Sequence, residues 1–150
     1  MSAPEARVAA TPTVLMIGAG PVATALAGAL RRSGIAVVGL WARRPAAARA
    51  AAAIAGVLPL SPALPDDLGR VDVIVVAVRD GAITEVAQRL VATGRIGRGQ
   101  VMLHCSGAVS ANAALGAVAE HLAGVGTLHP LSAIADGRAA MAELRGATVF

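Results

Sequence analysis

The feature that most constrains the fold of this chain is a glycine-rich turn between a predicted strand and a predicted helix. Residues 13–17 form a short apolar run of strand-forming residues, and the next six read Gly-Ala-Gly-Pro-Val-Ala, beginning at Gly18. Val22, Leu26 and Leu30 then recur at helical spacing. In such a unit the first glycine permits the tight turn, the second lets the backbone approach a diphosphate, and a small third residue lets the helix pack on the strand. GxGxxA alone is a weak signal, but in this context it predicts a dinucleotide-binding turn.

The rest of the chain alternates predicted strands with predicted helices. Further strands are predicted at residues 36–40, 57–60, 71–78, 101–104 and 125–128, and residues 147–150 begin another. Helices are predicted from Pro45 to Gly56, after a capping Asp80, from Ser110 to about Leu122, and at residues 139–144. The expected fold is therefore α/β, a Rossmann-type doubly wound and mainly parallel sheet with helices on both faces. Residues 1–12 are expected to form a flexible leader and residues 13–150 one domain.

Composition argues against nucleic-acid and membrane partners. The net charge is +4, but the thirteen basic residues are arginines spread along the chain, and one Trp, one Phe and no Tyr leave little for bases to stack on. Residues 8–30 carry no charge, yet glycines and prolines interrupt them, so a strand, turn and helix explain them better than a membrane span. A lone Cys105 favours a reducing cytoplasm, and three unpaired histidines give no metal site.

The end of the second predicted strand indicates which dinucleotide binds. Proteins that bind NAD often carry an acidic residue there, which accepts hydrogen bonds from the adenine ribose. This chain instead reads Leu-Trp-Ala-Arg-Arg from Leu40 to Arg44. Two guanidinium groups attract a 2′-phosphate, so Arg43 and Arg44 predict NADP(H) as cofactor. The alternative is that they are solvated arginines of a loop. The missing acid also argues against an S-adenosylmethionine enzyme.

Candidates for a reaction centre follow the later strands. Ser106 comes after the fifth predicted strand, where its hydroxyl and nearby N–H groups could meet a substrate carbonyl or carboxylate. His129 precedes Pro130 and is a candidate general acid, with a structural role equally open. His104 is interpreted as a hydrogen-bonded core histidine, and Cys105 as a packing residue. Arg79 could hold a carboxylate substrate.

Five segments together resemble a known family. They are Gly18 to Ala23, Trp41 to Pro45, Val75 to Asp80, His104 to Ala108 and Gly126 to Leu131. They are similar to bacterial Rossmann-like NADP-binding oxidoreductases that carry a C-terminal helical domain, DUF2520. That family is related to pyrroline-5-carboxylate reductase and to the 6-phosphogluconate and 3-hydroxyisobutyrate dehydrogenases. Ser-Gly-Ala combined with His-Pro-Leu is the specific part of the resemblance.

The resemblance implies site residues and partners. Ser106 and His129 are the expected catalytic residues. The expected cofactor-binding residues are Gly18, Gly20, Pro21, Val22, Ala42, Arg43, Arg44, Ala77, Val78, Arg79 and Ser106. Ala42 replaces a serine common in relatives, and Arg79 replaces a proline. Family members continue into the helical domain, which forms a homodimer and closes the site, so this chain is expected to be the cofactor-binding half, or a stand-alone form.

The function expected from the resemblance is an NADP(H)-dependent oxidoreductase. It would pass hydride to or from a small carbonyl, imine or hydroxy-acid substrate. Two alternatives stay open. One is a non-catalytic NADP-binding or sensor module, and the other is an enzyme like prephenate dehydrogenase, because those relatives also place His-Pro after a late strand.

Overall fold

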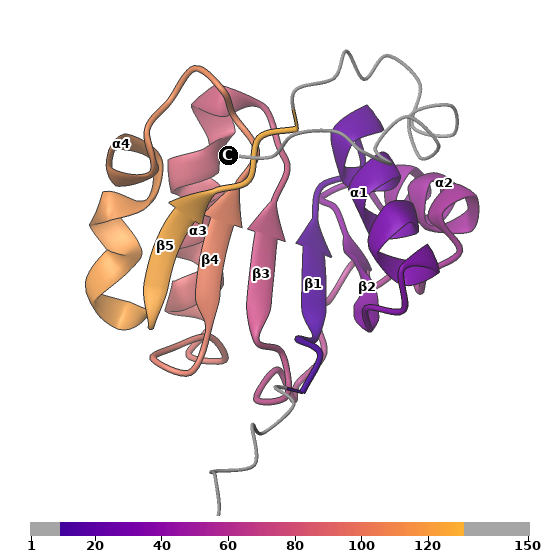
Figure 1. Ribbon diagram of the computed structural model, residues 1–150, viewed down its shortest axis with the longest axis horizontal. Coiled ribbons are helices and arrows are strands. Elements are labelled where there is room, and N and C mark those ends of the chain that lie inside the picture. Colours follow the sequence, from indigo (N-terminus) through magenta and orange to yellow (C-terminus); the bar gives the residue numbers. More distant parts are fainter. Residues whose placement is uncertain (1–9, 131–150) are drawn as a thin grey trace, which may run out of the picture.

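A computed structural model describes residues 10–130, which form a five-stranded sheet with helices on both faces (Figure 1). All four strand pairs are parallel, and the strand order is β2-β1-β3-β4-β5. The strands are β1 (Val14–Ile17), β2 (Val37–Trp41), β3 (Val73–Val76), β4 (Val101–His104) and β5 (Gly124–Thr127). The α-helices are α1 (Pro21–Arg32), α2 (Pro45–Ala55), α3 (Ile83–Ala92) and α4 (Ala111–Leu115), and the 3-10 helices are η1 (Asp80–Ala82) and η2 (Gly116–His121).

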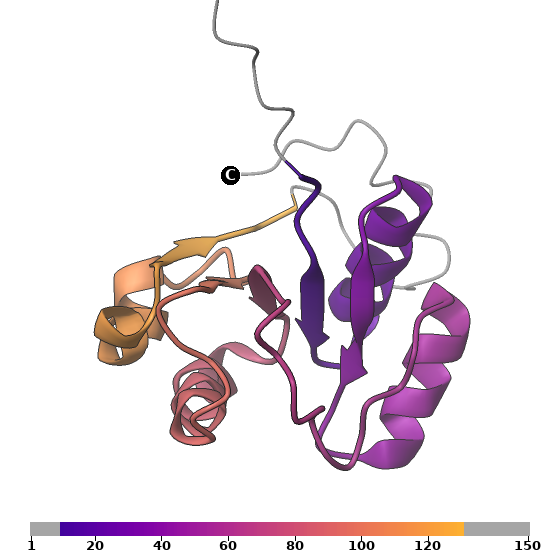
Figure 2. The ribbon, with the colours of Figure 1, turned by 90° about the horizontal axis from the view of Figure 1, so that it is seen from below.

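The order of the strands creates a crevice at one edge of the sheet. β1 and β3 are neighbours, but the chain leaves β1 toward β2 and leaves β3 toward β4. Because right-handed crossovers in opposite directions lie on opposite faces, α1 and α2 cover one face and α3 covers the other (Figure 2). Ligands of such sheets bind where the connections part, outside the carboxyl ends of the strands. The doubly wound α/β fold predicted from the sequence is confirmed.

The short central strands are apolar on both faces, and each face builds its own core. Leu15, Ile17 and Val76 belong to the core beneath α3 and α4, whereas Met16 and Val75 belong to the core beneath α1 and α2. Successive side chains of a strand point to opposite faces, so a continuous apolar run is what a sheet covered on both sides needs. The alanines of α2 let it pack closely on this second core, and those that are buried are Ala48, Ala51, Ala52 and Ala55.

Two expectations about the elements were wrong, and a third was right only in part. The strand predicted at residues 57–60 is reduced to one bridge between Leu40 and Pro59, since proline has no N–H with which to extend a ladder. Asp80 does not cap a helix: it lies in η1, and α3 begins after Ala82 without a side-chain cap. The helix after Ser110 has its predicted cap, because the Ser110 hydroxyl accepts from the Ala113 N–H at 3.2 Å, but it becomes 3-10 after five residues.

Some predictions fall outside the described residues. They are the leader through residue 9, the helix at residues 139–144 and the strand at residues 147–150. Between residues 10 and 130, the helices are too short or too polar to cross a bilayer. The same stretch brings together no group of three His, Cys, Asp or Glu side chains suited to a metal ion.

Candidate functional site

The glycine turn after β1 has a backbone that only glycine adopts without strain. Gly18 has φ +125°, and a Cβ placed on it would overlap the carbonyl oxygen of Ala77. Its N–H donates to the carbonyl of Trp41 at 2.8 Å. The turn is therefore held between the ends of β2 and β3, and Ala77, a predicted cofactor residue, is the backbone against which it packs.

The second glycine of the turn faces open space. A Cβ on Gly20 would meet nothing within 4 Å. Gly20 is the N-cap of α1 and provides no side-chain cap, and Pro21 occupies the first turn, where its missing N–H costs nothing. The first N–H groups of a helix have no partner within the helix, so this end of α1 presents donors and a positive dipole to an anion.

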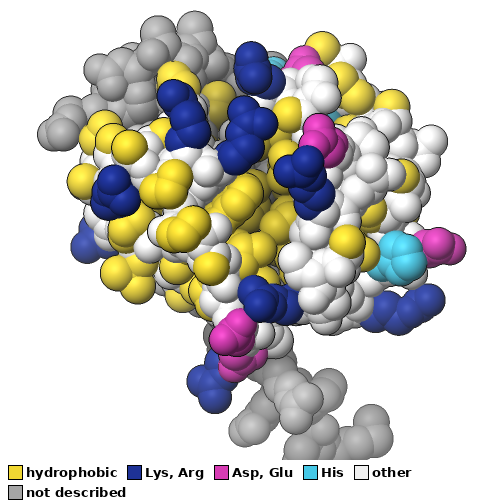
Figure 3. Space-filling model, turned by 180° about the vertical axis from the view of Figure 1, so that it is seen from behind, with side chains coloured by type: hydrophobic (Ala, Val, Ile, Leu, Met, Phe, Trp, Pro, Cys, Tyr) yellow, Lys and Arg dark blue, Asp and Glu magenta, His cyan; other side chains and the backbone are white. Residues whose placement is uncertain are grey.

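A cavity of about 580 Å³ opens beside this turn, over the face of the sheet that α3 covers. Its floor is apolar and arginines stand on its rim (Figure 3). The carboxyl ends of β1 and β2 form one side, α3 forms the other, and Leu64 of the loop after residue 60 closes the far end. This loop connects the reduced strand at 57–60 to β3 without a helix.

Seven of the predicted cofactor residues line this one cavity. They are Gly18, Gly20, Ala42, Arg43, Arg44, Val78 and Arg79. Pro21, Val22, Ala77 and Ser106 are not among the residues that line it. The sequence prediction thus brought together residues from three separate strand ends, because the carboxyl ends of neighbouring parallel strands meet at the same edge.

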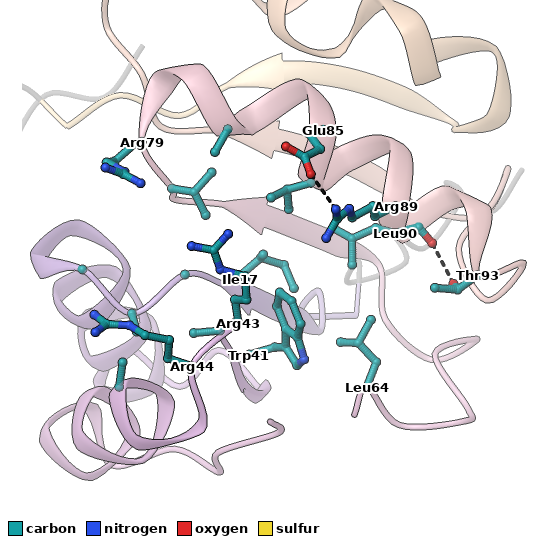
Figure 4. A pocket seen from close by; sticks show the side chains of 18 residues that line it. Ile17, Trp41, Arg43, Arg44, Leu64, Arg79, Glu85, Arg89, Leu90 and Thr93 are labelled. Carbon is teal, nitrogen blue, oxygen red and sulfur yellow. Dashed lines mark hydrogen bonds and ion pairs between the residues drawn. The ribbon is translucent and has the colours of Figure 1, made fainter. Parts of the chain in front are cut away.

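The cavity carries an excess of positive charge. Arg43, Arg44, Arg79 and Arg89 line it, and among residues 10–130 only the last of these forms an ion pair (Figure 4). That pair joins Arg89 to Glu85 at 2.7 Å across one turn of α3. Arg43 and Arg44 follow β2 and are exposed. Three uncompensated guanidinium groups around one apolar cavity suit a ligand that carries several negative charges.

The turn that presents the two arginines is fixed by residues that sequence reasoning missed. The hydroxyl of Ser61 donates to the carbonyl of Ala42, and the hydroxyl oxygen of Ser61 accepts from the Ala42 N–H at 3.0 Å. The indole N–H of Trp41 donates to the carbonyl of Pro62 at 3.1 Å. These bonds tie residues 41 and 42 to a segment about twenty positions later, a pairing that no local motif signals.

The histidine that ends β4 organises the next loop from inside the core. His104 is fully buried; its Nδ1 accepts from the Ser106 N–H at 3.1 Å, so its Nε2 carries the proton and donates to the Thr127 hydroxyl at 3.0 Å. Burial lowers the pKa of His104, and the charge of Asp80 opposes that shift only in part. The prediction of a hydrogen-bonded core histidine is confirmed.

His129 contacts the loop that carries Ser106, but neither residue is among those that line the cavity. Ser106 is buried, and its hydroxyl oxygen accepts from the Ala108 N–H at 3.1 Å. The Nδ1 of His129 donates to the carbonyl of Cys105 at 3.0 Å, and its Nε2 has no hydrogen-bond partner in the described part of the chain. That Nε2 lies 2.5 Å from where a Cβ on Gly107 would stand, so the glycine admits the ring. The Ser106 N–H, expected to face a substrate, is instead occupied by His104.

Cys105 takes no part in this arrangement through its thiol. Burial raises the pKa of the Cys105 thiol to about 12. A thiol with so little thiolate at neutral pH is a poor nucleophile. This fits the interpretation of Cys105 as a packing residue.

The comparisons with known proteins agree with this architecture. Residues 2–134 match the family described as Rossmann-like domain. No curated protein matches the chain. Among solved structures, a Bacteroides fragilis protein assigned as an NADP oxidoreductase is 28% identical, with a TM-score of 0.61 over 84% of this chain and 46% of that one.

Two imine reductases are also similar in structure. One, from Bacillus cereus BAG3X2, is 18% identical with a TM-score of 0.57, over 81% of this chain and 42% of that one, and shows likeness of fold alone. The other, the V8 variant of an imine reductase from Myxococcus stipitatus in complex with NAD+, is 25% identical with a TM-score of 0.55, over 81% of this chain and 41% of that one. The chain therefore spans less than half the length of these proteins.

Proposed function

The chain belongs to the Rossmann-like domain family, and from that premise we propose that it binds NADP(H) as the cofactor-binding part of an oxidoreductase. The observation that carries the proposal is the cavity in which an open glycine turn lies together with two arginines that form no ion pair within residues 10–130. The solved protein that is 28% identical is itself assigned as an NADP oxidoreductase, which supports the same reading.

The described residues fit such a cofactor at both of its phosphate-bearing groups, the diphosphate and the 2′-phosphate. The space over Gly20, which a Cβ would fill, and the N–H groups at the start of α1 would hold the diphosphate. Arg43 and Arg44 would hold the 2′-phosphate, since among the residues that line the cavity no acid stands at the end of β2. Val78 and Arg79 would continue the site from the diphosphate toward the ends of β4 and β5.

When bound, NADP(H) supplies the hydride, and the chain supplies placement and a proton. His129 is the proposed proton donor and acceptor, because its Nδ1 donates to the Cys105 carbonyl and no residue between 10 and 130 forms a hydrogen bond with its Nε2. The hydroxyl of Ser106 accepts from Ala108 and keeps its own proton, which it can donate to a substrate oxygen or nitrogen. Reduction of a carbonyl or imine then places the hydride on carbon and the proton on the heteroatom.

The proposal is tested first by cofactor titration. Trp41 is the single Trp of the chain and lines the cavity, so its fluorescence reports binding there. NADPH should quench it and bind at least about tenfold more tightly than NADH, which corresponds to roughly 1.4 kcal/mol. Equal dissociation constants for the two would overturn the assignment of NADP(H). A screen of small imines, carbonyls and hydroxy acids, read by NADPH absorbance, then tests the reaction.

A non-catalytic NADP-binding module is the second candidate. The observation that favours it is that Ser106 and His129 are not among the residues lining the cavity, and that the Ser106 N–H is already bonded. The reaction screen separates the two, since hydride transfer that falls when His129 is replaced by Ala supports the enzyme. Tight NADPH binding without turnover on any substrate supports the module. The helical DUF2520 domain and the homodimer remain predictions.

A further inference from the structure

We propose that Glu85 and Arg89 on α3 recognise the base of the cofactor and select adenine over hypoxanthine. This inference rests on the proposed function, because it concerns the same cavity. Both residues line the cavity, and neither was singled out by the sequence pattern. Glu85 is also the only carboxylate among the residues that line it.

The position of the base follows from the two phosphate groups that the adenosine ribose carries. With the diphosphate over Gly20 and the 2′-phosphate at Arg43 and Arg44, the ribose lies at the mouth of the cavity and the base extends inward. The inner wall toward α3 is formed by Val78, Ala82 and Val86, which offer apolar surface to one face of a flat ring. Arg43 stands across the cavity from α3, where a guanidinium can lie on the other face (Figure 4).

The polar edge of the base then meets the polar part of α3. Glu85 and Arg89 are held 2.7 Å apart, so an acceptor and a donor stand side by side at the cavity wall. Adenine presents the matching pair, because its N6 amino group donates and its N7 accepts. Hypoxanthine carries an oxygen in place of the amino group, and that oxygen would face the Glu85 carboxylate.

A carboxylate is otherwise out of place in this cavity. A site for phosphates alone gains nothing from a negative charge, whereas the edge of adenine needs an acceptor. The ordinary alternative is that the two residues form an exposed i,i+4 pair that stabilises α3 by about 0.3–0.5 kcal/mol. That role predicts no effect on which base is bound, so the two explanations differ in a measurable way.

The test compares NADPH with its hypoxanthine analogue, in which the adenine amino group is replaced by oxygen. Dissociation constants are measured by Trp41 fluorescence for the unchanged chain, for Glu85→Gln and for Glu120→Gln. The last is a matched control, because Glu120 pairs with His121 and is not among the residues that line the cavity. The unchanged chain should prefer NADPH by about tenfold, the size of one charge-assisted hydrogen bond at a partly exposed site.

Glu85→Gln should bring the two dissociation constants close together, since a Gln amide can donate to the oxygen as well as accept from the amino group. Glu120→Gln should keep the preference. An unchanged ratio in Glu85→Gln, or equal affinities in the unchanged chain, would overturn this inference while leaving the proposed function intact. Absence of NADPH binding to the unchanged chain would instead overturn the proposed function.

Discussion

Replacing both Arg43 and Arg44 by Ala should erase the preference for NADPH over NADH, whereas the loss of Arg43 stacking on the adenine should weaken the binding of both cofactors equally. Both side chains are exposed, line the cavity and form no ion pair among residues 10–130, so their charge is fully available to a ligand. The 2′-phosphate is the only group that distinguishes the two cofactors, so the loss of the arginine contacts with that phosphate appears in the ratio of the two affinities.

The magnitude follows from the exposure of the pair. Two unit charges 4 Å apart in water attract by about 1 kcal/mol, and a phosphate carries a charge of about −1.5 to −2, which gives roughly 3–4 kcal/mol for two arginines. Salt screening and the ordering of long exposed side chains remove about half of this or more. The remaining 1.4–2 kcal/mol corresponds to a preference of about ten- to thirtyfold.

The assay is titration of each cofactor against Trp41 fluorescence at low and high salt. Arg49→Ala is the matched control, because Arg49 is an exposed arginine on α2 that is not among the residues lining the cavity. The control should keep the preference, and added salt should shrink it in both the control and the unchanged chain. A double variant that still prefers NADPH by tenfold would refute the reasoning, since the selectivity would then arise elsewhere.

Three further predictions concern the turn and the β4 loop. Gly18→Ala should destabilise the chain by at least about 3 kcal/mol, because the new side chain strains the backbone and overlaps the Ala77 carbonyl. Gly20→Ala should keep the melting temperature of the unchanged chain and lose NADPH affinity. Equal melting temperatures for the two variants would contradict this. Gly107→Ala should lower the melting temperature by about 3–10 °C as the added methyl displaces the His129 ring, and an unchanged melting curve would argue against that contact. The folded chain lowers the pKa of His104 below its ordinary value of 6.5, so below pH 6.5 the unfolded chain binds more protons than the folded chain. The free energy of unfolding should therefore decrease as the pH falls below 6.5. His104→Gln should reduce this pH dependence, as measured by urea titrations at several pH values.

The Rossmann-like fold and the cluster of arginines that lines the cavity were predictable from local patterns. An apolar strand followed by a glycine turn and a helix is determined by backbone sterics, which depend on neighbouring residues alone. Parallel βαβ topology then places the carboxyl ends of neighbouring strands at one edge of the sheet, so the sequence alone could place Gly18, Arg43 and Arg79 near one another. The same local reasoning correctly placed His104 in the core.

Only the tertiary structure determined the contacts between segments that are distant in the sequence. Ser61 fixes the backbone of Ala42, and the N–H of Ser106 is directed inward to His104, where the sequence pattern suggested that it faced a substrate. Leu64, in the loop after Pro59, comes to line the cavity, and Glu85 and Arg89 line it from the other side only through the packing of α3. Periodicity reports which face of a helix is buried, but what lies opposite the polar face depends on how separate elements pack, and a single local sequence does not encode that.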